Sequence, residues 1–174
     1  MTSISPCQLP TTALLRRYGG EQAYSDCFVT EVNRTVALAP YVEAFYTTAL
    51  FKVERFLLRW FASLPSTDLD ASQLAEGSTQ AFSAWRVEDR TTDQLLLSDV
   101  TGRTRSWLMV APPEHVAGKG TRLFFGSAVL LFENPRSGER EMGFRFRALL
   151  GFHNLYSRLL LSAARARLLR QPAR

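Results

Sequence analysis

The fold class is decided by residues 80–111, which read QAFSAWRVEDRTTDQLLLSDVTGRTRSWLMVA. Apolar and polar side chains alternate along three short runs, and polar residues separate the runs, as in antiparallel strands joined by tight turns. The strands are predicted at 80–90, 93–100 and 103–111. The connections, Thr91-Thr92 and Thr101-Gly102, are two residues long, and the glycine tolerates positive φ. The stretch therefore predicts an antiparallel meander.

Two further strands are predicted on either side of this meander. The β-rich run 26–32 (DCFVTEV) predicts a first strand, and 121–132 (TRLFFGSAVLLF) predicts a long strand after the meander. Gly126 lies in the middle of the long strand and indicates a bulge or a bend there.

Helical periodicity appears before and after the strands. Apolar residues recur at three- and four-residue intervals from 38 to 64, which predicts one long helix, or two shorter ones if Thr47-Thr48 breaks it. A short helix is predicted at 71–75, with Asp70 as its N-cap. The same period over 148–170 predicts a long C-terminal helix.

The segregation of helices from strands predicts an α+β fold in which a curved antiparallel sheet packs against the long C-terminal helix. A length of 174 residues fits a single domain. Residues 26–174 are assigned to this domain. Residues 1–25 are assigned to an N-terminal arm, which the prolines and the Gly19-Gly20 pair predict to be loosely ordered over residues 1–20.

In this order of elements, over residues 26–170, the chain resembles the helix-grip fold of the START and polyketide-cyclase-like (SRPBCC) superfamily. The stretches AFYTTALFKVER, DQLLLSD, GRTRSWL, GTRLFFGSA and GFHNLYSRLLL look like blocks of an uncharacterised bacterial family. The resemblance implies a cavity between the sheet and the last helix. It also implies apolar ligands such as lipids, steroids or polyketides, and some members are enzymes, so the fold alone does not decide the activity.

The composition narrows the classes of partner. Of 21 basic residues only two are lysines, Lys52 and Lys119, and we expect no nucleic-acid partner because phosphate-binding surfaces commonly use both residue types. Cys7 and Cys27 lack the spacing of a zinc site, and no motif predicts a metal or another cofactor. There is no pattern of a secretory signal and no apolar run of about 18 residues, which predicts a cytoplasmic protein with reduced thiols.

Five arginines near the C-terminus leave two interpretations open. They form a solvated helix end, or they contact an anionic surface such as a membrane. These residues are Arg158, Arg165, Arg167, Arg170 and Arg174. A peripheral membrane contact and a homodimer both remain open as partners.

Pairing the predicted strands around their turns assigns side chains to two faces. Arg90 lies opposite Asp93, and Arg86 opposite Leu97. One face then carries Phe82, Ala84, Arg86, Glu88, Leu95, Leu97, Ser106 and Leu108. The other carries Ser83, Trp85, Val87, Gln94, Leu96, Ser98, Arg105, Trp107 and Met109. Because both faces are mixed, either both are partly covered or one lines a cavity with embedded polar groups.

Five candidate ligand-binding residues lie on these strands. Arg86 and Glu88 share a face and either form a surface ion pair or bind an anionic head group. Trp85 and Trp107 share the other face with Arg105. They are either core aromatics or a ligand platform with a cation–π contact.

Two further candidates, His153 and Tyr156, lie on one face of the C-terminal helix. His153 either makes a structural hydrogen bond, orients a ligand or acts as a general base. We expect the protein to bind a hydrophobic or amphipathic small molecule between sheet and helix. The alternatives are an enzyme of cyclase, hydrolase or isomerase type that uses the same cavity, and a membrane- or protein-interaction module that uses the basic helix.

Overall fold

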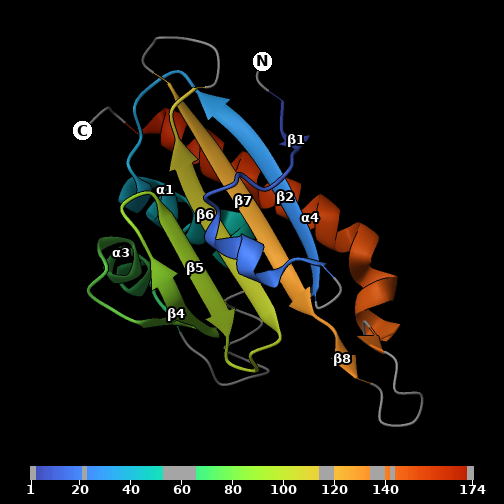
Figure 1. Ribbon diagram of the computed structural model, residues 1–174. Helices are drawn as coiled ribbons and strands as arrows, with labels where there is room; N and C mark the ends of the chain where they lie inside the picture. Colours follow the sequence, from blue (N-terminus) through green and yellow to red (C-terminus); the bar gives the residue numbers. More distant parts are fainter. Residues whose placement is uncertain are drawn as a thin grey trace.

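A seven-stranded antiparallel sheet forms the centre of the computed structural model, in the order β1-β2-β7-β6-β5-β4-β3 (Figure 1). The structure describes residues 3–20, 23–52, 66–113, 120–133, 140–141 and 144–171. The strands of the sheet are β1 (Ser5–Pro6), β2 (Ala23–Val32), β3 (Ala81–Phe82), β4 (Trp85–Arg90), β5 (Gln94–Asp99), β6 (Thr104–Ala111) and β7 (Thr121–Leu130). A separate two-stranded sheet joins β8 (Phe132–Glu133) and β9 (Arg140–Glu141).

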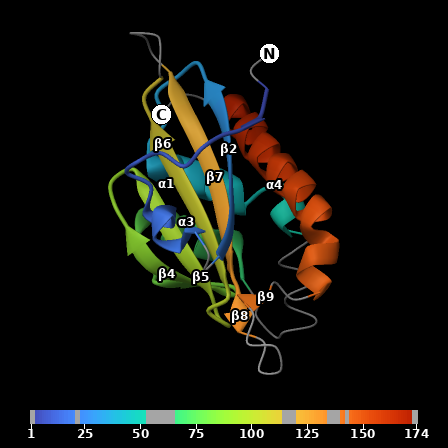
Figure 2. The same cartoon turned by 45° about the vertical axis from the view of Figure 1, so that its right-hand side comes forward.

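Helices and the N-terminal segment cover opposite faces of the sheet (Figures 1 and 2). One face, here called the helical face, packs against α1 (Leu38–Tyr46), α3 (Asp68–Glu76) and α4 (Phe144–Arg170). The other, the outer face, is covered by residues 7–20, which include the 3₁₀ helix η1 (Leu14–Tyr18). The α+β prediction with a long C-terminal helix is confirmed, and the mixed strand faces have a physical cause, since both are covered.

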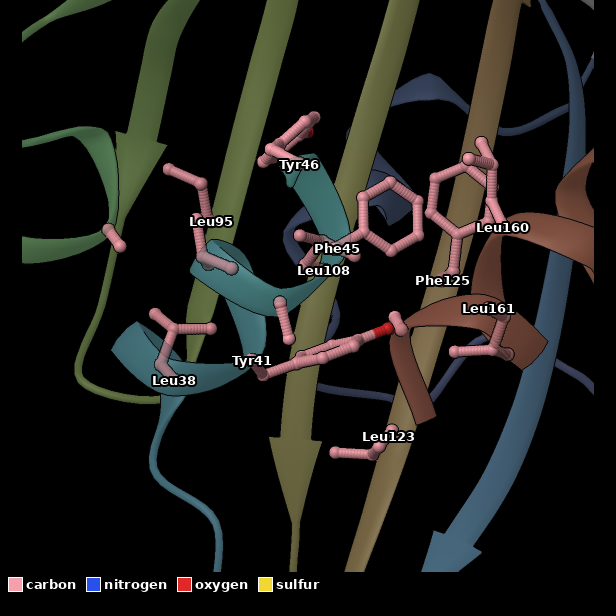
Figure 3. Close-up of a cluster of buried hydrophobic side chains, with 14 of the residues drawn as sticks. Leu38, Tyr41, Phe45, Tyr46, Leu95, Leu108, Leu123, Phe125, Leu160 and Leu161 are labelled. Carbon is pink, nitrogen blue, oxygen red and sulfur yellow. The ribbon is translucent and has the colours of Figure 1, made fainter. Parts of the chain in front are cut away.

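The core on the helical face is built around aromatic side chains of α1 (Figure 3). Tyr41 and Phe45 lie one turn apart on the helix and are at most 1% exposed. The ring of Phe45 lies 4.7 Å from that of Phe125 on β7, centroid to centroid. Leu160 and Leu161 of α4 complete the same cluster. Burial of these large apolar surfaces fixes the helices on the sheet.

Of the two alternatives for the helix predicted from residue 38, the structure has the break at Thr47-Thr48. The helix α1 ends at Tyr46, and the Thr47 hydroxyl donates to the carbonyl oxygen of Glu43 at 2.6 Å. The Thr48 hydroxyl accepts from the backbone N–H of Phe51 at 3.2 Å, and residues 49–52 are helical again. The remainder of the predicted helix, 53–64, lies outside the described residues.

The short predicted helix is α3, but its N-cap is Thr67 and not Asp70. The Thr67 hydroxyl accepts from the backbone N–H of Asp70 at 3.2 Å, and the Asp70 carboxylate accepts from the backbone N–H of Thr67 at 2.7 Å. This reciprocal capping box satisfies two donors at the helix start. Gly77, in the left-handed conformation at φ 81°, ends the helix.

The predicted strand 80–90 is two strands. A turn at Ser83-Ala84, with Ser83 at φ 53°, joins β3 to β4, so that Phe82 pairs with Trp85. The next turn also differs from its prediction. Arg90 pairs with Leu95, so the turn lies at Thr92-Asp93 and not at Thr91-Thr92.

The predicted faces of β4 are wrong because the ladder contains a bulge. The register between β4 and β5 shifts between Val87 and Asp89, so Val87 pairs with Leu97 and Arg86 with Ser98. A one-residue shift moves side chains to the opposite face. Arg86 therefore does not share a face with Leu97, and Trp85 does not share one with Trp107. The predicted register of β5 with β6 is correct, since Leu97 pairs with Ser106 and Leu95 with Leu108.

Gly126 marks a close approach and not a bulge. The pairing of β7 with both neighbours runs past Gly126 without a register shift. A Cβ atom at this position would lie 2.9 Å from the Asp26 carbonyl oxygen, 2.9 Å from a Leu15 methyl carbon and 3.1 Å from the Trp107 ring. The absence of a side chain at Gly126 lets Leu15 of η1 and the ring of Trp107 pack against the backbone of β7.

The prediction of a loosely ordered N-terminal segment is wrong. Leu15 is fully buried among Ala13, Cys27 and Trp107. Because residues 3–20 carry no helical or strand periodicity, the sequence shows no pattern that reveals this packing.

Candidate functional site

A cavity of about 210 Å³ lies between the helical face of the sheet and helices α1 and α4. This is where the sequence resemblance places one. Its apolar wall consists of Phe45, Phe51, Trp85, Phe125, Tyr156 and Leu160. The cavity is also lined by three of the predicted candidates, Trp85 on β4 and His153 and Tyr156 on α4. Such an apolar space with a few polar groups is typical of small-molecule sites.

Among the described residues of the cavity wall, two polar atoms are buried with neither a hydrogen bond nor an ion pair. They are the indole Nε1 of Trp85 and the hydroxyl of Ser157. Ser157 is 1% exposed and was not among the predicted residues. A buried polar group without a partner costs about 1–3 kcal/mol, so these two atoms favour a ligand that supplies the missing bonds.

Asp26, Ser127 and His153 form a polar cluster between the sheet and α4. Asp26 and Ser127 are paired on β2 and β7, and the Asp26 carboxylate accepts from the Ser127 backbone N–H at 2.9 Å and from its hydroxyl at 2.8 Å. His153 Nε2 lies 2.8 Å from the Ser127 hydroxyl and 3.2 Å from the second Asp26 oxygen. The cluster ties α4 to the middle of the sheet.

This cluster lacks the geometry of a serine nucleophile with its base. In that arrangement the carboxylate binds one imidazole nitrogen and the serine binds the other. Here both Asp26 and Ser127 meet the same nitrogen, Nε2 of His153. The single hydroxyl proton of Ser127 goes to Asp26, so the hydroxyl accepts from His153. The Ser127 hydroxyl is therefore satisfied on both sides, and the described contact of His153 is a structural one that also borders the cavity.

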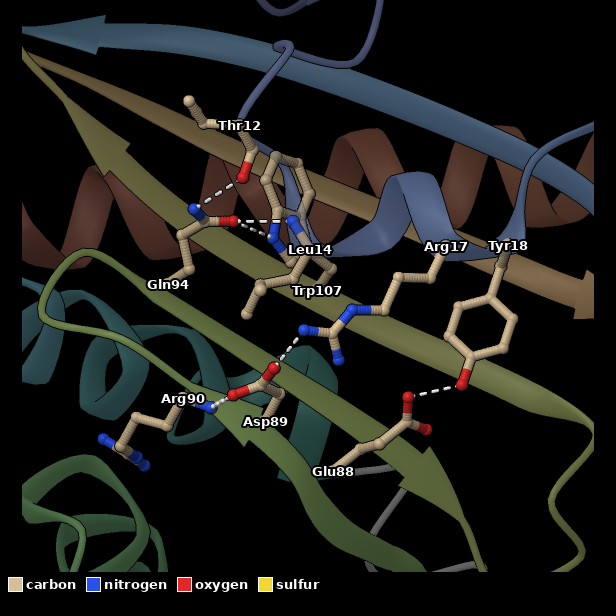
Figure 4. Close-up of polar contacts among 9 residues, drawn as sticks. All are labelled: Thr12, Leu14, Arg17, Tyr18, Glu88, Asp89, Arg90, Gln94 and Trp107. Atoms are coloured by element: carbon tan, nitrogen blue, oxygen red, sulfur yellow. Dashed lines mark hydrogen bonds and ion pairs between the residues drawn. The ribbon is translucent and has the colours of Figure 1, made fainter.

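Glu88 and Arg105 lie on the outer face, where they hold η1. Arg105 Nε lies 2.6 Å from a Glu88 carboxylate oxygen. The Tyr18 hydroxyl donates to the other oxygen, as Figure 4 shows. The Arg105 guanidinium also lies 4.5 Å from the centre of the Tyr18 ring. Burial is the main cause that raises the pKa of Tyr18, and the bond to Glu88 raises it further. Arg105 borders the cavity from β6, but its guanidinium belongs to this outer cluster.

Trp107 is fully buried on the outer face and does not reach the cavity. Its indole N–H donates to the Gln94 side-chain oxygen at 2.9 Å, which also accepts from the Leu14 backbone N–H at 2.9 Å (Figure 4). The Gln94 amide donates to the Thr12 carbonyl at 3.0 Å. Arg86 is exposed on β4 and is not among the cavity residues. The seven predicted candidates therefore divide between the cavity, the outer face and the surface.

Two arginines of the C-terminal helix, Arg158 and Arg165, contact β2. Arg165 donates to the Glu31 carbonyl on β2 at 3.0 Å, and the Arg158 guanidinium lies 5.4 Å from the centre of the Phe28 ring. Arg34, which lies outside the helix, donates to the carbonyls of Leu168 and Gln171 at the C-terminal end of α4. Cations at this end complement the helix dipole. Arg174 lies outside the described residues.

The described part of the chain holds neither a cluster of metal ligands nor a membrane-spanning helix. No group of three or more metal-ligating side chains occurs there. No helix within the same residues combines the length and the apolar character needed to span a bilayer.

No protein-family model and no curated protein matches the chain. Among solved structures, an uncharacterised protein from Rhizobium leguminosarum is similar, with 12% sequence identity and a TM-score of 0.32. The match covers 86% of this chain and 97% of that one. A similarity this weak carries no inference about fold or function.

Proposed function

We propose that the protein binds a small, uncharged amphipathic molecule in the cavity between the sheet and α4. The observation that carries this proposal is the pair of unpartnered polar atoms, Trp85 Nε1 and Ser157 Oγ, beside the apolar side chains of the cavity. The resemblance to the helix-grip superfamily, which stays a prediction, implies a ligand at the same place.

The cavity volume limits the size of the ligand. An apolar cavity of about 150 Å³ accommodates benzene, whereas sites for drug-sized ligands have about 300–1,000 Å³. A volume of about 210 Å³ therefore suits one aromatic ring with a short substituent better than a steroid or a long lipid.

The polar groups favour a neutral hydrogen-bond acceptor. Trp85 Nε1–H can only donate, and the Ser157 hydroxyl can donate or accept. Among the described residues, Arg105 is the one arginine bordering the cavity, and its guanidinium is paired with Glu88 on the outer face. The Asp26 carboxylate lies behind His153 and would repel an anion. A ketone, amide or ether oxygen fits this combination.

The proposal is tested with two probes of matched shape, acetophenone and ethylbenzene, titrated against the protein by calorimetry and thermal shift. We expect acetophenone to bind more tightly because only it has an acceptor. Loss of one neutral hydrogen bond, in Trp85→Phe or Ser157→Ala, should weaken acetophenone binding by roughly 2–12-fold and leave ethylbenzene binding little changed.

Two controls separate this site from other surfaces. Ser162 is exposed on the same helix, and Ser162→Ala should leave binding unchanged. Ser157→Leu places apolar bulk at the cavity and should abolish binding of both probes. Binding of acetophenone that survives Ser157→Leu, or the absence of binding by either probe, would contradict the proposal.

A further inference from the structure

Cys7 and Cys27 face each other on neighbouring segments at the edge of the sheet. Cys7 follows β1 directly, and its backbone N–H donates to the Cys27 carbonyl on β2 at 3.0 Å. Both thiols are free, and their sulfur atoms lie 3.0 Å apart. Because a disulfide bond is about 2.0 Å long, an approach of about 1 Å would join them.

The two thiols differ in access. Cys7 is partly exposed, whereas Cys27 is 5% exposed. Both line a groove of about 790 Å³ at the edge of β2, between residues 6–9 and α4. The groove is also lined by Arg16 and Arg158, which are exposed, and it is separate from the cavity of the proposed function.

The two thiols also differ in acidity. The pKa of the more exposed thiol, Cys7, is lowered and that of Cys27 is raised, and thiol–disulfide exchange requires an accessible thiolate. The hydrogen bond from Cys27 is the main cause that lowers the pKa of Cys7, burial opposes it, and the charge of Arg122 adds to the lowering. The same hydrogen bond is the main cause that raises the pKa of Cys27, and burial raises it further. Since the thiolate is the nucleophile, Cys7 is the thiol that reacts first.

We propose that Cys7 and Cys27 form a reversible redox pair that is oxidised by a low-molecular-weight disulfide bound in this groove. The Cys7 thiolate attacks one sulfur of that disulfide, the sulfur–sulfur bond breaks, and one thiolate leaves. A mixed disulfide on Cys7 results. Cys27 then attacks the Cys7 sulfur, its proton passes to the second departing thiolate, and an internal disulfide forms. The protein loses two electrons and two protons, and the small disulfide is reduced to two thiols.

The order of the two steps follows from the contacts. While Cys7 is a thiolate, its hydrogen bond and its charge keep the proton on Cys27. Formation of the mixed disulfide removes that charge, so the causes that raise the pKa of Cys27 decrease and it becomes able to attack. Asp26 also lines the groove, but its carboxylate contacts Ser127 and His153. The two guanidinium groups of Arg16 and Arg158 outnumber this carboxylate, so the groove favours an oxidant that carries carboxylates.

The test uses glutathione disulfide, which is acidic, and cystamine, which is cationic, with intact-mass measurement of the native protein. Wild type should lose two hydrogen atoms in mass, and a reductant should reverse this. Cys27→Ser should stop at a glutathione adduct, whereas Cys7→Ser should react at least about 10-fold more slowly than Cys27→Ser. Arg158→Ala should slow the reaction with glutathione disulfide by roughly 2–5-fold and not that with cystamine.

Both cysteine variants are also treated in denaturant. There the single remaining thiol of Cys7→Ser should react at the same rate as that of Cys27→Ser, which confirms that both thiols are intact. A native wild type that accumulates adducts without an internal disulfide would overturn the proposal. Equal native reactivity of Cys7→Ser and Cys27→Ser would overturn it as well. These outcomes are independent of ligand binding in the cavity, because the probes and residues differ.

Discussion

Gln94 offers the sharpest test of how the N-terminal segment is held on the sheet. This side chain is 4% exposed and makes three hydrogen bonds, to Trp107, to the Leu14 backbone N–H and to the Thr12 carbonyl. Gln94→Leu retains most of the volume but leaves all three partners unsatisfied. At about 0.5–1.5 kcal/mol for each bond, and with some gain from the apolar side chain, we expect a loss of about 1–4 kcal/mol in unfolding free energy. For a chain of this size the melting temperature should fall by about 2–16 °C.

The assay is urea unfolding followed by fluorescence, combined with amide hydrogen exchange. The exchange protection of Leu14 should decrease most, because its N–H is bonded directly to Gln94. The matched control is Gln73→Leu, since Gln73 is exposed on α3, and it should change stability by less than about 0.5 kcal/mol. A loss below about 1 kcal/mol in Gln94→Leu, or unchanged protection at Leu14, would refute the role assigned to Gln94.

Three further substitutions test other parts of the structure. Gly126→Ala should destabilise the protein by about 1–3 kcal/mol because its Cβ would overlap Leu15. Leu15→Ala should therefore cost less in the Gly126→Ala background than it does alone. Strictly additive losses in urea unfolding would contradict this contact. Thr67→Ala should cost about 1 kcal/mol by removal of the capping box, whereas Thr67→Ser should retain it in the same measurement. Burial raises the pKa of Tyr41 well above its ordinary value, so above a pH of about 10 only the unfolded chain loses this proton and the unfolding free energy should fall as pH rises. Tyr41→Phe should show a shallower alkaline decrease, and an identical slope in both proteins would contradict the assignment.

The sequence was sufficient for the fold class and for the register of one hairpin. The Thr101-Gly102 turn predicts the pairing of Ser98 with Arg105, and the structure has it. The faces of β4 could not be predicted, because the bulge between Val87 and Asp89 places an extra residue in the ladder. The sequence Val87-Glu88-Asp89 contains no signal of that extra residue. That single shift separates Trp85 from Trp107 and moves Arg86 and Glu88 away from the cavity.

The contacts that shape the site are long-range and leave no local pattern. Trp85, His153 and Tyr156 were predicted as candidates and border the cavity, because the helix period and the element order place them there. Asp26 and Ser127 were missed, since their contact depends on the pairing of β2 with β7. Ser157 was missed because a serine within a helix has no distinguishing signal until its burial is known.

The pairing of β2 with β7 fixes the order in which the sheet can assemble during synthesis. Asp26 and Ser127 are 101 residues apart in the chain, although their strands are neighbours. The meander from β3 to β7 can pair locally while the ribosome adds about 5–20 residues per second, but β2 must wait for β7 to emerge. During that interval the apolar side chains of β2 lack their partner, and an unpaired strand is a target for addition by other chains. Translation pauses between β2 and β7 should therefore increase aggregation of the nascent protein more than pauses after β7.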